Sequence, residues 1–267
     1  MTILSPFLAI LCGLAMFSAA GCAAKQDIPA KKFSEILNRY PPTDEPLRIK
    51  KLTASSAQDI GPAKYGRSVT MIVHPAYSLF FREERRSRYT EAKYDLLKFQ
   101  LDSEARFISA MAKTDAIVVL VLPGNFQTES IAPLSYINYL NTTAGHGQSV
   151  YYITTEIWSS GALSMDSMVK LYAFLQQIRA DKILIGGGFI GRCQREFYNQ
   201  TAAYLEQVSA YIVPEISSIS PDDISTPEAS EILESIQRRD YTPVKRFIEK
   251  KSQGAAGILQ LPAAPAL

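Results

Sequence analysis

The chain has 267 residues, of which 47% are hydrophobic and 20% charged, and its formal net charge is +2. This near balance of charge excludes the strongly basic composition that nucleic-acid binding requires, so we expect no nucleic-acid partner. The composition is that of a globular protein, and the length is sufficient for one α/β domain with a complete core.

An apolar run at the N-terminus ends at Phe17 and is followed by Ser18-Ala-Ala-Gly21 and then Cys22. The run is too short to remain in a bilayer as a spanning helix, and small residues at its end are typical of a cleaved secretory signal. The junction Ala-Ala-Gly-Cys resembles the processing site of bacterial lipoproteins. That resemblance implies removal of residues 1–21 and attachment of lipid, including palmitate, to Cys22. An ordinary signal peptide or a buried apolar helix is the alternative.

The same resemblance implies a location and a partner. Ala23 rather than aspartate follows Cys22, which by the family's sorting rule favours the outer membrane over the inner membrane. We therefore expect a protein of the cell envelope, anchored by lipid and facing the periplasm, with the membrane as one partner. Its other partner would be a small molecule or an envelope protein.

Cysteine usage limits how the mature chain is stabilised. Cys12 would leave with the signal peptide and Cys22 would carry lipid, so only Cys193 remains. No disulfide within the chain is then possible, although the compartment permits one. Cys193 is either a buried, inert thiol or a functional one.

Composition divides the mature chain into three parts. Residues 22–66 contain several prolines and a basic excess, which indicates a lipidated N-terminus and a tether. Residues 67–251 form one domain without internal repeats. Residues 252–267 are rich in alanine and proline and indicate a flexible tail.

Apolar strand-like runs alternate with helical periods through the domain. The expected elements in chain order are a strand at 68–74, a helix at 89–113, a strand at 115–122, a helix at 131–140, a strand at 149–155, a helix at 165–179, a strand at 182–185, a helix at 191–208, a strand at 210–213 that ends at Pro214, and a last helix at 227–239. Strands without polar alternation are buried on both faces. We therefore expect a three-layer α/β/α fold with a mostly parallel sheet of five or six strands in Rossmann-like order.

Ligands in such sheets bind beyond the carboxyl ends of the strands. His74 follows the first strand, Glu156 and Trp158 follow the third, and Glu215 follows the fifth. The fourth strand leads into Gly187, Gly188, Gly191 and Arg192. These residues form the expected binding rim. Counted from Gly186, the glycines also match a dinucleotide-binding spacing. They follow the fourth strand, however, without an acidic residue at the right distance, so we expect no cofactor.

The stretch from Ile185 to Cys193 resembles the nucleophile turn of isochorismatase-like cysteine hydrolases. In that family a glycine ends the fourth strand and the catalytic cysteine opens the next helix six residues later, as Gly187 and Cys193 do. The resemblance implies that family's fold and Cys193 as nucleophile. The family's aspartate and lysine are replaced, by His74 and by residues 154–156.

Two main hypotheses follow. The first is a lipid-anchored protein whose α/β domain binds a ligand or partner without catalysis. The alternative is a cysteine-dependent amide or ester hydrolase with Cys193 as nucleophile, His74 as base, and Glu156 or Glu215 orienting the imidazole. A third possibility is a structural envelope subunit. No metal site is expected, because two histidines and one thiol lack ligand spacing.

Overall fold

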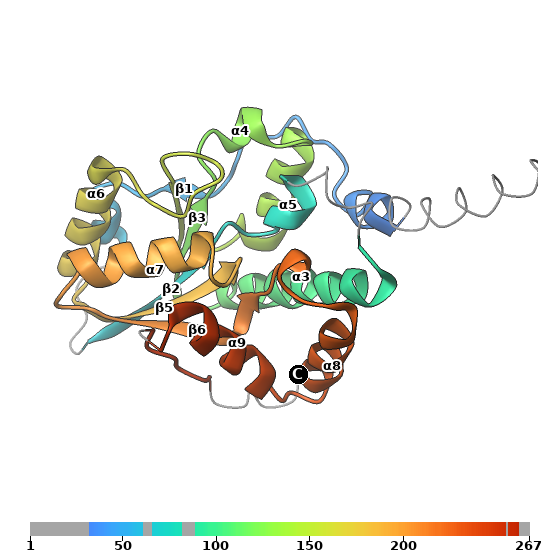
Figure 1. The fold of residues 1–267 in the computed structure, drawn as a ribbon. Helices are drawn as coiled ribbons and strands as arrows, with labels where there is room; N and C mark the ends of the chain where they lie inside the picture. The colour runs from blue at the N-terminus through green and yellow to red at the C-terminus, as the bar shows by residue number, and fades with distance from the viewer. Residues whose placement is uncertain (1–31, 61–65, 82–88, 255, 262–267) are drawn as a thin grey trace, which may run out of the picture.

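The computed structural model describes residues 32–60, 66–81, 89–254 and 256–261. A single parallel sheet lies between two layers of helices (Figure 1). Its strands are β1 (Lys50–Lys51), β2 (Arg67–Val73), β3 (Ile117–Leu122), β4 (Val150–Thr154), β5 (Ala180–Gly188) and β6 (Ser209–Ser218), in the spatial order β1-β4-β3-β2-β5-β6. The expected three-layer fold with a parallel sheet is thereby confirmed.

Most helices lie in the crossover connections between strands, whereas the helix at 32–37 precedes β1 and the last three helices follow β6. In chain order, the helices are a short helix at 32–37, η1 (Ser56–Asp59), α2 (Tyr77–Phe80), α3 (Glu91–Ala112), α4 (Phe126–Glu129), α5 (Pro133–Ala144), α6 (Met165–Gln177), α7 (Cys193–Tyr204), η3 (Pro221–Asp223), α8 (Thr226–Gln237) and α9 (Thr242–Ser252). The expected helices between the strands are all present, with ends that differ by a few residues.

Alternation along the central strands builds a core on each face of the sheet. In β2, Val69, Met71 and Val73 pack with α6 and α7, whereas Ile72 packs with α3 and α5. All six residues of β3 are buried. Burying a side chain of this size contributes about 1.5–3 kcal/mol, which is why continuous apolar runs become the inner strands.

The C-terminal part differs from the expectation at two places. β6 does not end at Val213 but continues through Pro214, because the ladder to β5 is irregular there and does not need the missing N–H. The helix α9 was not expected from the sequence. It buries only Val244 and Ile248, so its apolar stripe is narrow among charged residues.

The expectation that residues 22–66 form a tether is wrong for residues 32–60. Phe33, Ile36, Ile49 and Leu52 are buried in the core, and β1 pairs with β4. The tail differs as well, since the Gly257 carbonyl accepts the Ile212 N–H at 2.8 Å. The folded domain therefore includes residues 32–60 at its N-terminal side and the segment around Gly257 at its C-terminal side.

The predicted signal peptide and Cys22 lie outside the described residues, so lipidation stays a prediction. Within the described part of the chain, no helix combines the length and the apolar character needed to cross a bilayer.

Candidate functional site

The loop after β2 is held by two buried side chains from the neighbouring helices. His74 and Ala76 both have positive φ angles, of 48° and 51°. The Tyr136 hydroxyl donates to the Pro75 carbonyl at 3.1 Å, and the Ala76 N–H donates to Glu104 Oε1 at 2.8 Å. Burial raises the pKa of Glu104 to about 7. This loop therefore has a fixed shape, and it places His74 at the carboxyl end of the sheet.

His74 is a buried, neutral imidazole. Its Nε2 lies 3.3 Å from Thr155 Oγ1. The residue is 1% exposed, and burial lowers its pKa to about 3. Thr155 Oγ1 donates its one proton to the Ile157 carbonyl at 2.8 Å and accepts the Gly124 N–H at 3.0 Å. The remaining lone pair of Thr155 accepts from His74 Nε2, which carries the ring proton in this assignment.

The other ring nitrogen of His74 is then an acceptor. Nδ1 is buried and has no hydrogen-bond partner within the described structure. An unpartnered buried polar atom costs about 1–3 kcal/mol in a folded protein. A ligand that donates a hydrogen bond to Nδ1 would recover that free energy.

The His74 imidazole is the first of four stacked rings. His74 and Tyr77 are 5.1 Å apart between ring centroids, and Tyr77 and Phe81 are 5.3 Å apart with planes inclined by only 8°. Trp158 stacks on Phe81 at 6.5 Å, and Phe189 meets Tyr77 edge-on at 6.1 Å. Trp158 is half-buried, whereas the other rings are buried. The carboxyl end of the sheet is therefore an aromatic site with Trp158 at its solvent side.

Cys193 begins α7 next to this site and is 7% exposed. Its thiol donates to the Ser159 carbonyl at 3.5 Å. A methyl group at Gly161 would lie 1.8 Å from the Cys193 carbonyl oxygen, so only glycine allows this loop to approach α7. The Gly161 N–H donates to Glu196 Oε2 at 2.8 Å and fixes the loop there. The loop after β4 thus covers the thiol.

The glycines of β5 allow the strand to pack closely on β2. Gly187 has φ of 82°, and a Cβ there would lie 2.1 Å from the Val73 carbonyl oxygen. β2 and β5 are neighbours, with Val73 opposite Gly187. Gly188 ends β5 with a cis peptide bond to Phe189, and Gly191 lies in the turn before α7.

Gln194 is a second buried residue with an unsatisfied acceptor at this end of the sheet. Its Nε2 donates to the Gly187 carbonyl at 3.2 Å and to Ser217 Oγ at 2.7 Å. Its Oε1 is buried and has no partner in the described structure. Two buried acceptors at the ends of β2 and β5 therefore lack a partner in the described structure.

The structure separates the other predicted rim residues from the aromatic site. Arg192 makes two hydrogen bonds to Asp223, at 3.0 and 2.7 Å, which raise its pKa and tie α7 to η3. Glu156 is exposed, and Thr155 rather than Glu156 or Glu215 contacts His74, so the predicted orienting carboxylate is wrong.

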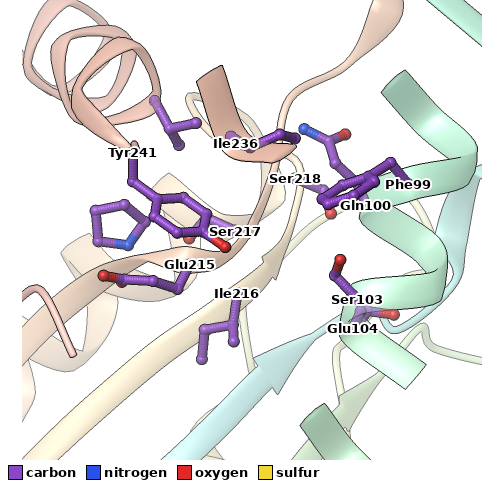
Figure 2. Close-up of a pocket in the computed structure, with 12 residues that line it drawn as sticks. Phe99, Gln100, Ser103, Glu104, Glu215, Ile216, Ser217, Ser218, Ile236 and Tyr241 are labelled. Atoms are coloured by element: carbon purple, nitrogen blue, oxygen red, sulfur yellow. The ribbon is translucent and has the colours of Figure 1, made fainter. Parts of the chain in front are cut away.

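Glu215 belongs to a different place, a small cavity between α3 and β6. Figure 2 shows Tyr241 and Ser103 on opposite sides of this cavity, with Glu215 beside Tyr241. The Leu261 N–H donates to Glu215 Oε1 at 3.2 Å, and burial raises the pKa of this carboxyl. The cavity volume of about 20 Å³ has room for one water molecule, which is too little for a ligand.

Sequence reasoning missed Glu104, Thr155 and Gln194. Glu104 had a detectable signal, because it lies in the series Leu97, Leu101, Glu104, Ile108 on one face of α3. A carboxyl group on an apolar helix face is expected to be buried and to have specific partners. Thr155 and Gln194 carry no such signal, since polar residues are common at strand ends and in the first turns of helices.

Comparisons with known proteins find no matching family model and no matching curated protein. Solved structures with a similar arrangement include pyrazinamidase/nicotinamidase from Streptococcus mutans UA159, with 10% identity, a TM-score of 0.42 and coverage of 72% of this chain and 99% of that one. Pyrazinamidase from Pyrococcus horikoshii, in complex with zinc, has 10% identity, a TM-score of 0.43 and coverage of 73% and 99%. An isochorismatase-like hydrolase from Alkaliphilus metalliredigens has 12% identity, a TM-score of 0.39 and coverage of 69% and 99%.

The last of these carries the name of the family that the stretch from Ile185 to Cys193 resembles. At such identities and TM-scores, the similarity establishes neither a family nor an activity for this chain.

Proposed function

We propose that the protein is a lipid-anchored protein of the cell envelope whose α/β domain binds a small, planar, uncharged molecule at the aromatic site. The observation that carries the ligand-binding part is the buried Nδ1 of His74, which lacks a partner beside the stacked rings of Tyr77 and Phe81. The anchor rests on the signal that ends at Cys22.

The chemistry of the site selects the ligand class. A charged ligand would be desolvated among aromatic rings and a neutral imidazole, and burying a charge without a counter-charge is unfavourable. A planar ring would stack on Tyr77 or Phe81, and each aromatic pair contributes about 0.5–1.5 kcal/mol beyond the area that it buries. An N–H or O–H group on the ring edge would donate to His74 Nδ1.

Entry to the site requires movement at Trp158. This side chain is half-buried and follows Ile157, which is exposed. The buried rings lie behind it, stacked through Phe81 and Tyr77.

The ligand class is tested with two probes of equal shape. Indole has an N–H donor, and benzofuran has an oxygen in its place. By calorimetry, indole should bind the wild-type protein about two- to tenfold more tightly than benzofuran, the range that one net hydrogen bond provides. His74→Phe should abolish the preference while keeping a ring in the stack.

His146→Phe is the matched control, because His146 is exposed and follows α5. It should leave both affinities unchanged. A preference for indole that persists in His74→Phe, or the absence of binding by either probe, would contradict the proposed site.

A second function, hydrolysis of an ester or amide, is favoured by the position of Cys193. The residue opens the 12-residue helix α7, where the helix N-terminus stabilises a thiolate. Its thiolate would attack the acyl carbon and release an alcohol or amine, and water would then hydrolyse the thioester. Two observations weigh against this function. The Cys193 thiol is engaged in a hydrogen bond to the Ser159 carbonyl. The candidate base, His74, has a pKa of about 3 and therefore accepts protons poorly at neutral pH.

p-Nitrophenyl acetate tests hydrolysis directly. A burst of nitrophenol with an acetylated Cys193 in the mass spectrum, absent in Cys193→Ala, would establish the hydrolase. Wild-type and Cys193→Ala proteins that release nitrophenol at the same slow rate would exclude it.

A further inference from the structure

Large apolar side chains are exposed mainly at one end of the molecule. Of the seven exposed ones in the described residues, four lie at the carboxyl end of the sheet: Ile131 at 40%, Leu134 at 45%, Ile157 at 53% and Met165 at 61%. Ile131 follows α4, Leu134 is in the first turn of α5, Ile157 follows β4, and Met165 begins α6. In a parallel α/β domain, each of these positions lies beyond a strand's carboxyl end.

The segments that carry Ile131, Leu134 and Ile157 are packed on one another. A Cβ at Gly124 would lie 2.9 Å from the Ile157 Cα, so the loops after β3 and β4 touch. The Ile131 N–H donates to the Phe80 carbonyl at 2.9 Å. Phe81, the next residue, stacks on Trp158. We call Ile131, Leu134, Ile157 and Trp158 the apolar end surface.

The N-terminal part of the described chain lies at the same end. Lys32 forms an ion pair with Glu91 at 2.7 Å, and its carbonyl accepts from the Tyr94 hydroxyl at 2.8 Å. Glu91 and Tyr94 are in the first turn of α3, which follows β2 and so begins at the carboxyl end of the sheet. In Figure 1 the blue helix at 32–37 lies beside α5, and the Asn138 side chain of α5 donates to the Pro41 carbonyl at 2.6 Å.

The covalent distance to the predicted anchor is short. Lys32 follows Cys22 by ten positions, and ten steps of a fully extended chain span at most about 35 Å. A lipid on Cys22 would therefore hold this end of the domain near the bilayer surface. Tethering keeps the local concentration of lipid high, so a few inserted side chains are enough for docking.

We propose that the apolar end surface rests on the lipid bilayer, and that the aromatic site behind Trp158 receives its planar ligand from the lipid phase. This inference rests on the lipid anchor of the proposed function. Glu129 and Glu156 are exposed at the same end, and their charges disfavour anionic headgroups. The partner is thus a zwitterionic lipid surface.

Trp158 is the only tryptophan in the chain and reports on the docking. The full-length lipidated protein is reconstituted into phosphatidylcholine vesicles whose acyl chains carry bromine, which quenches tryptophan at close range. Docking predicts a loss of Trp158 emission relative to unbrominated vesicles. Ile157→Glu and Leu134→Glu should each restore the emission.

Tyr204→Glu is the matched control, because Tyr204 is exposed at the last position of α7, at the opposite end of the sheet. It should leave the quenching unchanged. Unfolding in urea confirms that the three exposed substitutions leave the domain folded.

Flotation with vesicles separates the two proposals. Wild-type protein that floats with the vesicles while Trp158 keeps its emission would overturn the docking and leave the anchor intact. Wild-type protein that does not float would overturn both. Flotation lost in Cys22→Ser, together with quenching in the wild type, supports both.

Discussion

Glu104 gives the sharpest stability prediction, because it is a buried carboxyl without a cationic partner in the described structure. The residue is 4% exposed, and Oε1 accepts hydrogen bonds from the Ala76 N–H at 2.8 Å and the Tyr139 hydroxyl at 3.2 Å. Burial outweighs these two hydrogen bonds and raises its pKa from 4.5 to about 7. Glu104→Gln keeps the size and the acceptor oxygen but removes the titration.

The sign follows from proton linkage. A raised pKa means that the folded protein binds the proton more tightly than the unfolded chain does. The stabilisation is therefore complete below pH 4.5 and is lost as the pH rises to about 7. The shift of the Glu104 pKa from 4.5 to about 7 corresponds to about 3 kcal/mol of unfolding free energy, since a tenfold change in the protonation equilibrium is worth about 1.4 kcal/mol.

The assay is urea unfolding of wild type and Glu104→Gln at a series of pH values. His74 titrates in the opposite sense in the same range, so the wild-type curve alone conceals the effect. The difference between the two proteins removes the His74 contribution. We predict that the free energy of unfolding of Glu104→Gln increases relative to wild type by about 2–3 kcal/mol between pH 5 and pH 8. A difference that stays constant over this range would refute the reasoning about Glu104.

Three further predictions concern other buried residues. His74→Phe should flatten the acid side of the stability profile, because the lowered pKa of His74 makes wild type lose up to about 5 kcal/mol of unfolding free energy as the pH falls from 6.5 to 3; an equally steep loss in the variant would show that His74 is not the cause. Leu52→Ala should cost about 2–5 kcal/mol in urea unfolding, because Leu52 is in the core, whereas the exposed Leu134→Ala should cost less than about 0.5 kcal/mol; equal effects would mean that residues 32–60 are a tether after all. Cys193 should react with iodoacetamide much more slowly in the folded protein than in urea, and Cys193→Ser should cost about 1–3 kcal/mol because it buries a hydroxyl; fast labelling of the folded protein would instead favour the hydrolase.

The central sheet was predictable because its signal is local and strong. The run Ile117–Leu122 is apolar at every position, and strands buried on both faces show this pattern. The alternation of such runs with long helices requires parallel crossovers, whereas the expected neighbourhood of the first and fourth strands, β2 and β5, came only from the isochorismatase-like resemblance.

The predictions of secondary structure and domain boundaries were wrong where long-range packing overrides local sequence signals. Phe33 and Leu52 lie between prolines and basic residues, so their sequence gives no periodicity, yet each fills a gap in the core. Pro214 is a strand breaker in sequence, but an irregular ladder tolerates it. α9 has too few apolar positions to stand out.

The candidate site was predictable in its location but not in its contacts. Strand ends indicated His74, Trp158 and Cys193 as neighbours of one rim, because the fold class dictates where strands end. The hydrogen bond from His74 to Thr155 depends on side-chain orientation, which spacing in the sequence does not specify. The stack of Tyr77 and Phe81 on Trp158 likewise forms between separate loops.

The measurement that tests the proposed ligand site most directly is the nitrogen NMR shift of the His74 side chain. In protein labelled with ¹⁵N-histidine at neutral pH, Nδ1 should show the shift of an unprotonated nitrogen without a hydrogen bond, because the pKa is about 3 and the atom has no partner in the described structure. Saturation with indole should move this resonance toward the shift of a hydrogen-bonded acceptor, while benzofuran leaves it in place. An Nδ1 resonance that ignores indole, or that is already protonated in the free protein, would contradict the account.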